Sequence, residues 1–420
     1  MNASQAVKID ENINQIETDI CIVGGGPGGA LLGFLLARDG INCHVIEKAE
    51  DFNRDFRGES LSPDARKLLE NYGFKDFMDE HGYLESKCLH LFENNESLMK
   101  FEFDEFDYDS RYMIEFPQPA LLEGIVEKAK KFESFNIMMG TSCQDLIIED
   151  DVVVGVTISD RKKVKTQIRA KLVVAADGRY SRLRKKAGIE STITQTDRDV
   201  IWISLKRPEG WFEESRIKLS KDKHLVVLPT YPDNLRIGCN IPSGGYKTFK
   251  EEGVENLKKL IIELEPSLEQ IVNDQIKDWK GISLLDIFIA HVDEWSRDGL
   301  VLMGDAAHTI TPMMGQGIKH ALFDAQKLHE VIVQRLSEKP EGAILSEELQ
   351  GYQLTRKKQT DFISSIQSRQ EKVFKFSSPA KTLLRRTIYR VMNKLVFLKH
   401  AMVRRVYFSQ YPVAQNTNDH

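Results

Sequence analysis

The stretch DICIVGGGPGGALLGFLLARDG, residues 19–40, decides the fold of this 420-residue chain. It opens with a short apolar run, and residues 28–40 then repeat apolar side chains with helical periodicity and end at a glycine. The segment NCHVIE, residues 42–47, is again strand-like. A strand, a glycine-rich turn, a helix and a second strand in this order predict a βαβ unit.

The turn between the first strand and the helix has the spacing of a dinucleotide-binding motif. Gly24, Gly26 and Gly29 match G-x-G-x-x-G, and Glu47 ends the next strand 23 residues after Gly24. The glycines allow a tight turn and a close approach of the backbone to a pyrophosphate, which the N-terminus of the helix attracts. The carboxylate suits a ribose hydroxyl. These residues predict a dinucleotide site but do not decide between NAD and FAD.

The remaining segments predict an α/β protein with a second, sheet-rich lobe and a helical C-terminal part. Helical patterns cover 62–74 and 118–132, a hairpin covers 142–158, and a strand covers 170–178. Closely spaced strands follow from Val200 to Pro242. We therefore predict a Rossmann-type dinucleotide-binding domain in three parts (1–75, 118–190 and 281–345), a substrate domain in two parts (76–117 and 191–280) and a helical C-terminal extension (346–420).

Composition indicates a large globular protein, with 41% hydrophobic residues, 29% charged residues and a net charge of −5. The first eighteen residues lack the apolar core of a signal peptide, and no apolar run reaches membrane-spanning length, so we expect a cytoplasmic protein. Five widely spaced cysteines indicate neither a disulfide framework nor a zinc site. We expect no metal ion and no nucleic-acid partner.

Two later motifs decide the cofactor. The strand in VVAADGRYSRLRKKAG (173–188) ends at Asp177 and Gly178, and GLVLMGDAAHTITPMMGQG (299–317) has a strand that ends at Gly304 and Asp305. Together with the glycine motif, these segments resemble the class A flavoprotein monooxygenases, the family of aromatic and polyketide hydroxylases that includes tetracycline-inactivating oxygenases. The resemblance spans roughly residues 19–345.

The resemblance implies FAD as the cofactor and assigns its binding residues. Asp305 would hold the ribityl chain, and Pro312 would lie beside the oxygen-reactive face of the flavin. Gly315, Gln316 and Gly317 would face the pyrimidine edge of the flavin. No side chain is implied as a catalytic acid or base. The implied cofactor-binding set is Gly24, Gly26, Gly29, Glu47, Arg57, Gln118, Asp177, Gly178, Gly304, Asp305, Pro312, Gly315, Gln316 and Gly317.

The same resemblance implies a reaction. NAD(P)H would reduce FAD, and oxygen would reach an aromatic, quinone-like or polycyclic small molecule through a flavin hydroperoxide. The runner-up is an FAD-dependent reductase of prenyl lipids or other unsaturated substrates. A flavin-dependent halogenase is less favoured because its W-x-W-x-I-P signature is missing, and a non-catalytic partner-binding protein is less favoured because Asp305 is present. The substrate, the choice between NADPH and NADH, and the choice between monomer and homodimer stay open.

Several further residues have two interpretations each. His308 is a loop residue that bonds the backbone or a general base. Arg182 and Arg184 form a solvated helix face or bind the electron donor. Aromatic residues of the sheet-rich lobe belong to its core or to the substrate pocket. The last group comprises Trp202, Trp211, Phe212 and Tyr231.

The C-terminal part is strongly basic. Residues 351–420 hold 14 Lys/Arg and 3 Asp/Glu, whereas residues 1–350 hold 44 and 60. The segment 378–408 predicts one long amphipathic helix. Because the body is acidic, we expect the apolar stripe of this helix to pack against the body, in preference to a membrane or a dimer partner. The stripe comprises Leu384, Ile388, Val391, Leu395, Leu398, Met402 and Val406.

Overall fold

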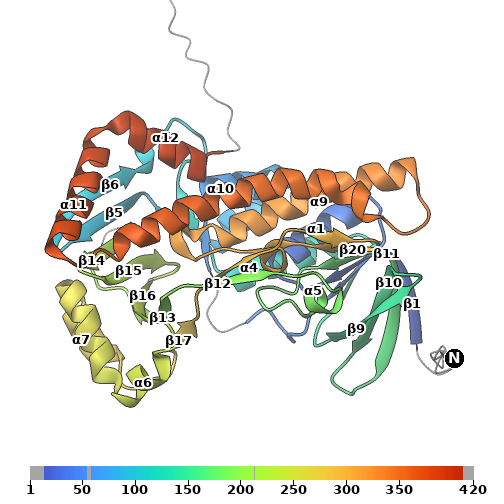
Figure 1. Ribbon diagram of the computed structural model, residues 1–420, viewed down its shortest axis with the longest axis horizontal. Helices are drawn as coiled ribbons and strands as arrows, with labels where there is room; N and C mark the ends of the chain where they lie inside the picture. The colour runs from blue at the N-terminus through green and yellow to red at the C-terminus, as the bar shows by residue number, and fades with distance from the viewer. Residues whose placement is uncertain (1–13, 54–57, 212, 410–420) are drawn as a thin grey trace, which may run out of the picture.

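The computed structural model describes residues 14–53, 58–211 and 213–409 and has two lobes side by side (Figure 1). One lobe holds the N-terminal βαβ unit, and the other holds a large antiparallel sheet. The long helix α10 (Gln350–Phe374) extends along both lobes, with α9 (Gly317–Glu338) beside it (Figure 1). The overall α/β architecture agrees with the sequence-based prediction.

The first lobe contains a Rossmann-type sheet. Strand β1 (Asn14–Val23) lies between β2 (Cys43–Ile46) and β11 (Lys165–Ala175) and is parallel to both. Strand β8 (Phe135–Met138) extends the sheet beyond β2, and β20 (Leu300–Leu302) extends it beyond β11. Parallel pairing brings the carboxyl ends of these strands to one edge, where ligands bind in such sheets. An antiparallel hairpin of β9 (Ser142–Glu149) and β10 (Val152–Ser159) and the short β19 (Ser296–Arg297) complete it.

Helices cover this sheet on the side of the βαβ unit. Helix α1 (Pro27–Arg38) is buried almost along its whole length. A Cβ atom on its Gly33 would lie 2.9 Å from side chains of Phe135 and Val45, so glycine lets the helix lie close to the sheet. Helix α2 (Pro63–Asn71) begins where its sequence predicts, with the Ser62 hydroxyl accepting from the backbone at Ala65. The other helices of this lobe are α3 (Lys75–His81), α4 (Gln118–Ala129) and α5 (Arg182–Lys186).

The second lobe is built on a seven-stranded sheet. Its order is β17-β13-β16-β15-β14-β5-β6, so strands from two distant parts of the chain pair in it. Apolar side chains of one face, such as Ile201 and Ile237, share a buried core with Leu257 and Ile261 of helix α7. The elements are β5 (Cys88–Glu93), β6 (Glu96–Glu102), β13 (Arg198–Lys206), β14 (Glu214–Ser220), β15 (Lys223–Thr230), β16 (Asn234–Pro242), β17 (Ser283–Leu285), α6 (Tyr246–Glu251), α7 (Val254–Leu264) and α8 (Glu269–Gln275).

Two small sheets lie between the lobes. The first has the order β3-β7-β4, and the second has the order β12-β18-β21. Arg179 connects the segment after β11 to the second of these sheets. Its guanidinium pairs with Asp286 and lies 4.6 Å from the ring centre of Phe288 in β18. The strands are β3 (Ser60–Leu61), β4 (Leu84–Ser86), β7 (Met113–Glu115), β12 (Thr192–Gln195), β18 (Phe288–His291) and β21 (His308–Thr309).

The C-terminal segment differs from its prediction in two ways. It forms two helices, α11 (Pro379–Lys394) and α12 (Val396–Tyr407), because Leu395 between them has non-helical angles of φ −87° and ψ 73°. The helices dock on the body, as expected, and Val406 of the expected stripe is buried in α12, but α11 docks through another face. Arg385 is fully buried and pairs with buried Glu93 of β5, whereas Leu384 of the expected stripe is 51% exposed.

The buried pair between Arg385 and Glu93 predicts a large stability difference between neighbouring arginines. Replacing Arg385 with Met leaves the carboxylate buried with weaker compensation from Arg386, and we expect unfolding to become easier by about 3–5 kcal/mol. Arg390 is the matched control, because its partner Glu96 is exposed and Arg390→Met should cost at most about 1 kcal/mol. Urea unfolding followed by circular dichroism measures both. Equal effects of the two substitutions would contradict the prediction.

Candidate functional site

A cavity of about 860 Å³ lies between the glycine-rich edge of the first lobe and the large sheet of the second. Residues from both lobes line it, and so does Tyr407 at the end of α12. Twelve of the fourteen predicted cofactor-binding residues line this single cavity. The two exceptions are Gln316, which is completely buried, and Arg57, which lies outside the described residues.

The first turn has the shape that close approach to a phosphate requires. Gly24 has φ +119°, and a Cβ atom there would lie 2.2 Å from the carbonyl oxygen of Ala176. A Cβ atom on Gly29 would lie 1.9 Å from the carbonyl oxygen of Gly24, so the helix can begin here only with glycine. A Cβ atom on Gly26 would meet nothing within 4 Å, which leaves open space at the N-terminus of α1.

Glu47 supports this turn from the end of β2. One of its carboxylate oxygens accepts from the backbone N–H of Gly25 at 2.9 Å, and the other accepts from that of Ala49 at 2.8 Å. The side chain is 3% exposed and lines the cavity. Because each carboxylate oxygen has further lone pairs, the predicted bond to a ribose hydroxyl is compatible with these contacts.

The second turn follows β20. Gly304 has φ +60°, and Asp305 lines the cavity directly after it. Pro312, Gly315 and Gly317 line the same wall, and α9 begins at Gly317, so the N-terminal end of its dipole faces the cavity. The amide nitrogen of Gln316 donates to the carbonyl of Met314 at 3.0 Å, which stabilises the turn from inside the protein.

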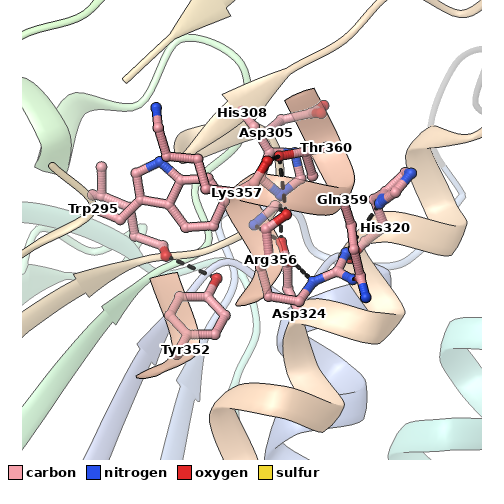
Figure 2. Close-up of polar contacts among 12 residues, drawn as sticks. Trp295, Asp305, His308, His320, Asp324, Tyr352, Arg356, Lys357, Gln359 and Thr360 are labelled. Carbon is pink, nitrogen blue, oxygen red and sulfur yellow. Dashed lines mark hydrogen bonds and ion pairs between the residues drawn. The ribbon is translucent and has the colours of Figure 1, made fainter. Parts of the chain in front are cut away.

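A buried carboxylate holds this second turn in place (Figure 2). Asp324 of α9 is fully buried and accepts from the backbone N–H of Gly304 at 2.9 Å. It also pairs with His308 Nε2 at 2.6 Å and with Arg356 Nε of α10 at 2.6 Å. Burial alone would raise the pKa of Asp324, but His308 and Arg356 outweigh it and hold this pKa well below its usual range. His308 is therefore a structural partner of a buried acid, which differs from both of its sequence-based interpretations.

Asp177 and Gly178, which follow β11, line the cavity and also shape the local structure. The carboxylate of Asp177 accepts from the Ser181 hydroxyl at 2.5 Å and from the backbone N–H of Arg182 at 2.7 Å, so it caps helix α5. Gly178 has φ +85° and open space where a Cβ would be. Arg184 is buried and donates to the carbonyl of Ala306 at 2.8 Å, so the interpretation as a solvated helix face is wrong for this residue.

Gln118 begins helix α4 and joins it to the segment before β3. Its side-chain amide donates to the carbonyl of Gly58 at 3.0 Å, and the residue lines the cavity. Among the four aromatic residues considered for the pocket, Trp202 lines the cavity, whereas Trp211 and Tyr231 are absent from the wall formed by the described residues. Phe212 lies outside the described residues.

The sequence analysis missed an acid on the cavity wall. Glu115 is 1% exposed on β7, and one of its oxygens accepts from the Ser60 hydroxyl at 2.7 Å. The other oxygen has no hydrogen-bond partner among the described residues. Burial raises the pKa of Glu115 to about 7, against the opposing effects of Arg236 and Ser60. The sequence contained one signal for this residue, an acidic residue within the otherwise apolar segment MIEF, residues 113–116.

The wall around Glu115 belongs to the second lobe. Alternate residues of neighbouring strands face the cavity, because successive side chains of a strand point to opposite faces. Apolar and polar side chains both occur on this face, and its charged groups are two arginines. The residues of β13 to β16 on this wall are Arg198, Val200, Trp202, Ser215, Ile217, His224, Val226, Leu228, Arg236, Gly238 and Asn240.

The cavity fits FAD by its shape and by its chemistry. Open space at Gly26, Gly178 and Gly317 lies along the wall on which FAD was predicted. Two helix N-termini, those of α1 and α9, face the same space, as an anionic pyrophosphate and an electron-rich flavin require. Acidic side chains for hydroxyl groups, Glu47 and Asp305, lie on this wall as well.

Comparison with known proteins agrees with this fit. Residues 17–357 match the FAD-binding domain family, so the chain belongs to that family. Over 320 residues, 76% of each chain, it is 33% identical to a 6-methylpretetramide 4-monooxygenase from Streptomyces rimosus. It is 24% identical to squalene epoxidase 6 of Arabidopsis thaliana over 381 residues, 88% of this chain and 72% of the relative.

A solved structure shows the same fold. The p-nitrophenol 4-monooxygenase of Pseudomonas putida superposes with a TM-score of 0.78 at 20% identity, over 93% of this chain and 97% of that one. The protein is thus a class A FAD-dependent monooxygenase. The expected family, cofactor and reaction class are confirmed.

Asp305 gives the first prediction for this site. Asp305→Ala removes an anionic acceptor for the hydroxyl groups of the ribityl chain, a charge-assisted bond worth about 1.5–3 kcal/mol. We expect FAD affinity to fall about ten- to a hundredfold, measured by equilibrium dialysis and flavin fluorescence. Asp274→Ala, at an exposed position of α8, is the control. Unchanged FAD retention in Asp305→Ala would show that this carboxylate does not hold the cofactor.

Glu115 gives the second prediction. Because burial raises its pKa from 4.5 to about 7, the folded state holds this proton more tightly than the unfolded state. Its contribution to stability is therefore complete below pH 4.5 and is lost as the pH rises through 7. Glu115→Gln should abolish this loss, which is on the order of 3 kcal/mol because one pKa unit is about 1.4 kcal/mol. Urea titrations from pH 5 to 8 measure it, and parallel curves for both proteins would contradict the assignment.

Proposed function

We propose that this monooxygenase hydroxylates an aromatic, quinone-like or polycyclic small molecule that carries an acidic hydroxyl group, with NAD(P)H as the electron donor. The observation that carries the proposal is the cavity itself. It continues from the predicted FAD wall to the large sheet of the second lobe, and between them the buried acid Glu115 of β7 keeps an oxygen without a partner among the described residues. The relative from Streptomyces rimosus supports a polycyclic aromatic substrate.

The residues of this chain would bind and orient the two reactants. Apolar side chains of the sheet, such as Trp202 and Val226, would pack on the faces of the substrate rings and exclude water. Glu115 would accept a hydrogen bond or a proton from the substrate hydroxyl, which makes a phenol ring more electron-rich. When bound, FAD supplies the redox chemistry by which NAD(P)H and dioxygen yield a hydroxylated product and water.

Isotope incorporation tests the reaction. Purified protein is incubated with NADPH or NADH, ¹⁸O₂ and a panel of naphthols, anthraquinones and larger polycyclic phenols. We expect one ¹⁸O atom in the product and faster NAD(P)H oxidation with the cognate substrate. Reduction of a prenyl double bond without oxygen, and no incorporation into any phenol, would instead favour the reductase function.

Glu115→Gln tests the proposed substrate contact within the same assay. The variant keeps the size of the side chain and the bond to Ser60 but cannot accept a proton. We expect kcat/KM for a phenolic substrate to fall at least about a hundredfold, and its rise with pH near 7 to disappear. The FAD content should stay equal to that of the wild type. Equal loss on a methyl ether of the same substrate would indicate a structural role instead.

A further inference from the structure

The C-terminal helices leave a long apolar surface uncovered. Leu383 is 65% exposed and Phe397 is 68% exposed, so most of each side chain faces solvent. The surface begins on α11 and continues across the break before α12. We call it the outer stripe, and it consists of Leu383, Leu384, Val391, Leu395, Val396, Phe397 and Leu398.

Buried charges fix the outward orientation of this stripe. On the inner side, Arg385 and Arg386 pair with buried Glu93. Further along, the ammonium of Lys399 lies 3.0 Å from the carboxylate of Glu105. If either helix rotated about its axis so that its leucines became buried, these ion pairs would break. The inward face thus combines these basic side chains with apolar ones of a shared core, and the outward face keeps large apolar side chains exposed.

The charges around the stripe show what could cover it. Residues 378–409 contain eight Lys/Arg and no Asp/Glu. Among them Lys381, Lys394 and Arg405 are exposed, and no ion pair engages them within the described residues. Apolar side chains with lysine and arginine beside them match the boundary between acyl chains and anionic headgroups of a lipid bilayer.

We propose that the outer stripe is a docking surface for an anionic membrane, into which Leu395, Val396, Phe397 and Leu398 insert. Helices α11 and α12 lie at the end of the second lobe that faces away from the Rossmann-type sheet, so the lobes do not obstruct such contact (Figure 1). None of the helices in the described part of the chain is long and apolar enough to cross a bilayer. The contact is therefore interfacial.

A second copy of the chain is the alternative occupant, and charge disfavours it. A two-fold interface places the same patch against itself. The exposed Lys381, Lys394 and Arg405, which no ion pair engages within the described residues, would then approach the same cations of the second copy, which opposes association. Phosphatidylglycerol or a similar anionic lipid supplies the charge that a second copy lacks.

The same helix that carries part of the stripe also reaches the cavity. Val396, Phe397 and Leu398 lie at the start of α12, and Tyr407 at its end lines the cavity and lies near the turn at Met314, with 3.4 Å from its hydroxyl to that carbonyl. Membrane docking would bring a lipid phase close to one wall of the active site. The docking proposal does not depend on which substrate the enzyme hydroxylates.

Vesicle flotation with the full chain tests the proposal. Vesicles of phosphatidylcholine with 30% phosphatidylglycerol are compared with phosphatidylcholine alone, at low and at high salt. We expect binding to the anionic vesicles that weakens with salt. The double substitution F397S/L398S should reduce binding about tenfold or more, because two inserted side chains are lost. Lys394→Glu should reduce it about fivefold or more.

Matched variants separate docking from general damage. Leu354→Ser removes a side chain that is 68% exposed on α10, outside the stripe, and Lys259→Glu reverses an exposed charge on α7. Both should bind vesicles like the wild type. Leu384→Ser, at the other end of the stripe, repeats the test if F397S/L398S loses FAD or its circular dichroism spectrum.

Three outcomes would overturn the proposal. The wild type could fail to float with anionic vesicles, or F397S/L398S and Leu384→Ser could both float as well as the wild type. Alternatively, light scattering could show a wild-type dimer that F397S/L398S converts to a monomer, which would assign the stripe to a second copy. ¹⁸O incorporation by the same variants in detergent-free solution is measured in parallel, so that failure of docking and failure of the hydroxylase function are distinguished.

Discussion

The carboxylate of Asp324 is the interaction on which the active site depends most. It accepts from the backbone of Gly304 and pairs with His308 and Arg356, so one buried charge joins a loop, a short strand and two long helices (Figure 2). A buried anion is costly unless it is paired and hydrogen-bonded, and here three donors satisfy it. The position of Asp305 on the cavity wall follows from that arrangement.

Buried charge also joins the C-terminal helices to the body. Lys319 of α9 lies 2.7 Å from Asp64, which accepts as well from the backbone of Ser409 beyond α12. With the pair of Arg385 and Glu93, these contacts connect both lobes to the end of the chain. Ion pairs of this kind specify geometry, because only one arrangement leaves every charge compensated.

The sequence predicted the Rossmann-type unit and the glycine turns well, because backbone shape there depends on local residues such as Gly24 and Gly29. It did not predict Glu115 or Arg236, which lie on strands of two different sheets and come close only in the tertiary structure. The predicted orientation of the first C-terminal helix was wrong for a related reason. Periodicity identifies an apolar stripe, but the partner of the opposite face, Glu93, lies almost 300 residues earlier.

The part of the cavity that the sequence predicted and the part that it did not predict have different chemical roles. The FAD wall consists of turns and helix ends, whose backbone amides recognise any molecule with the same phosphates and flavin edge. The opposite wall consists of side chains on a sheet, where each strand can change without disturbing the turns. Glu115 lies between the two walls, on a small strand paired to Ser60, and its raised pKa is a property of that position. Reaction class is thus encoded near the glycines, whereas substrate choice depends on which groups the second lobe places around one acid.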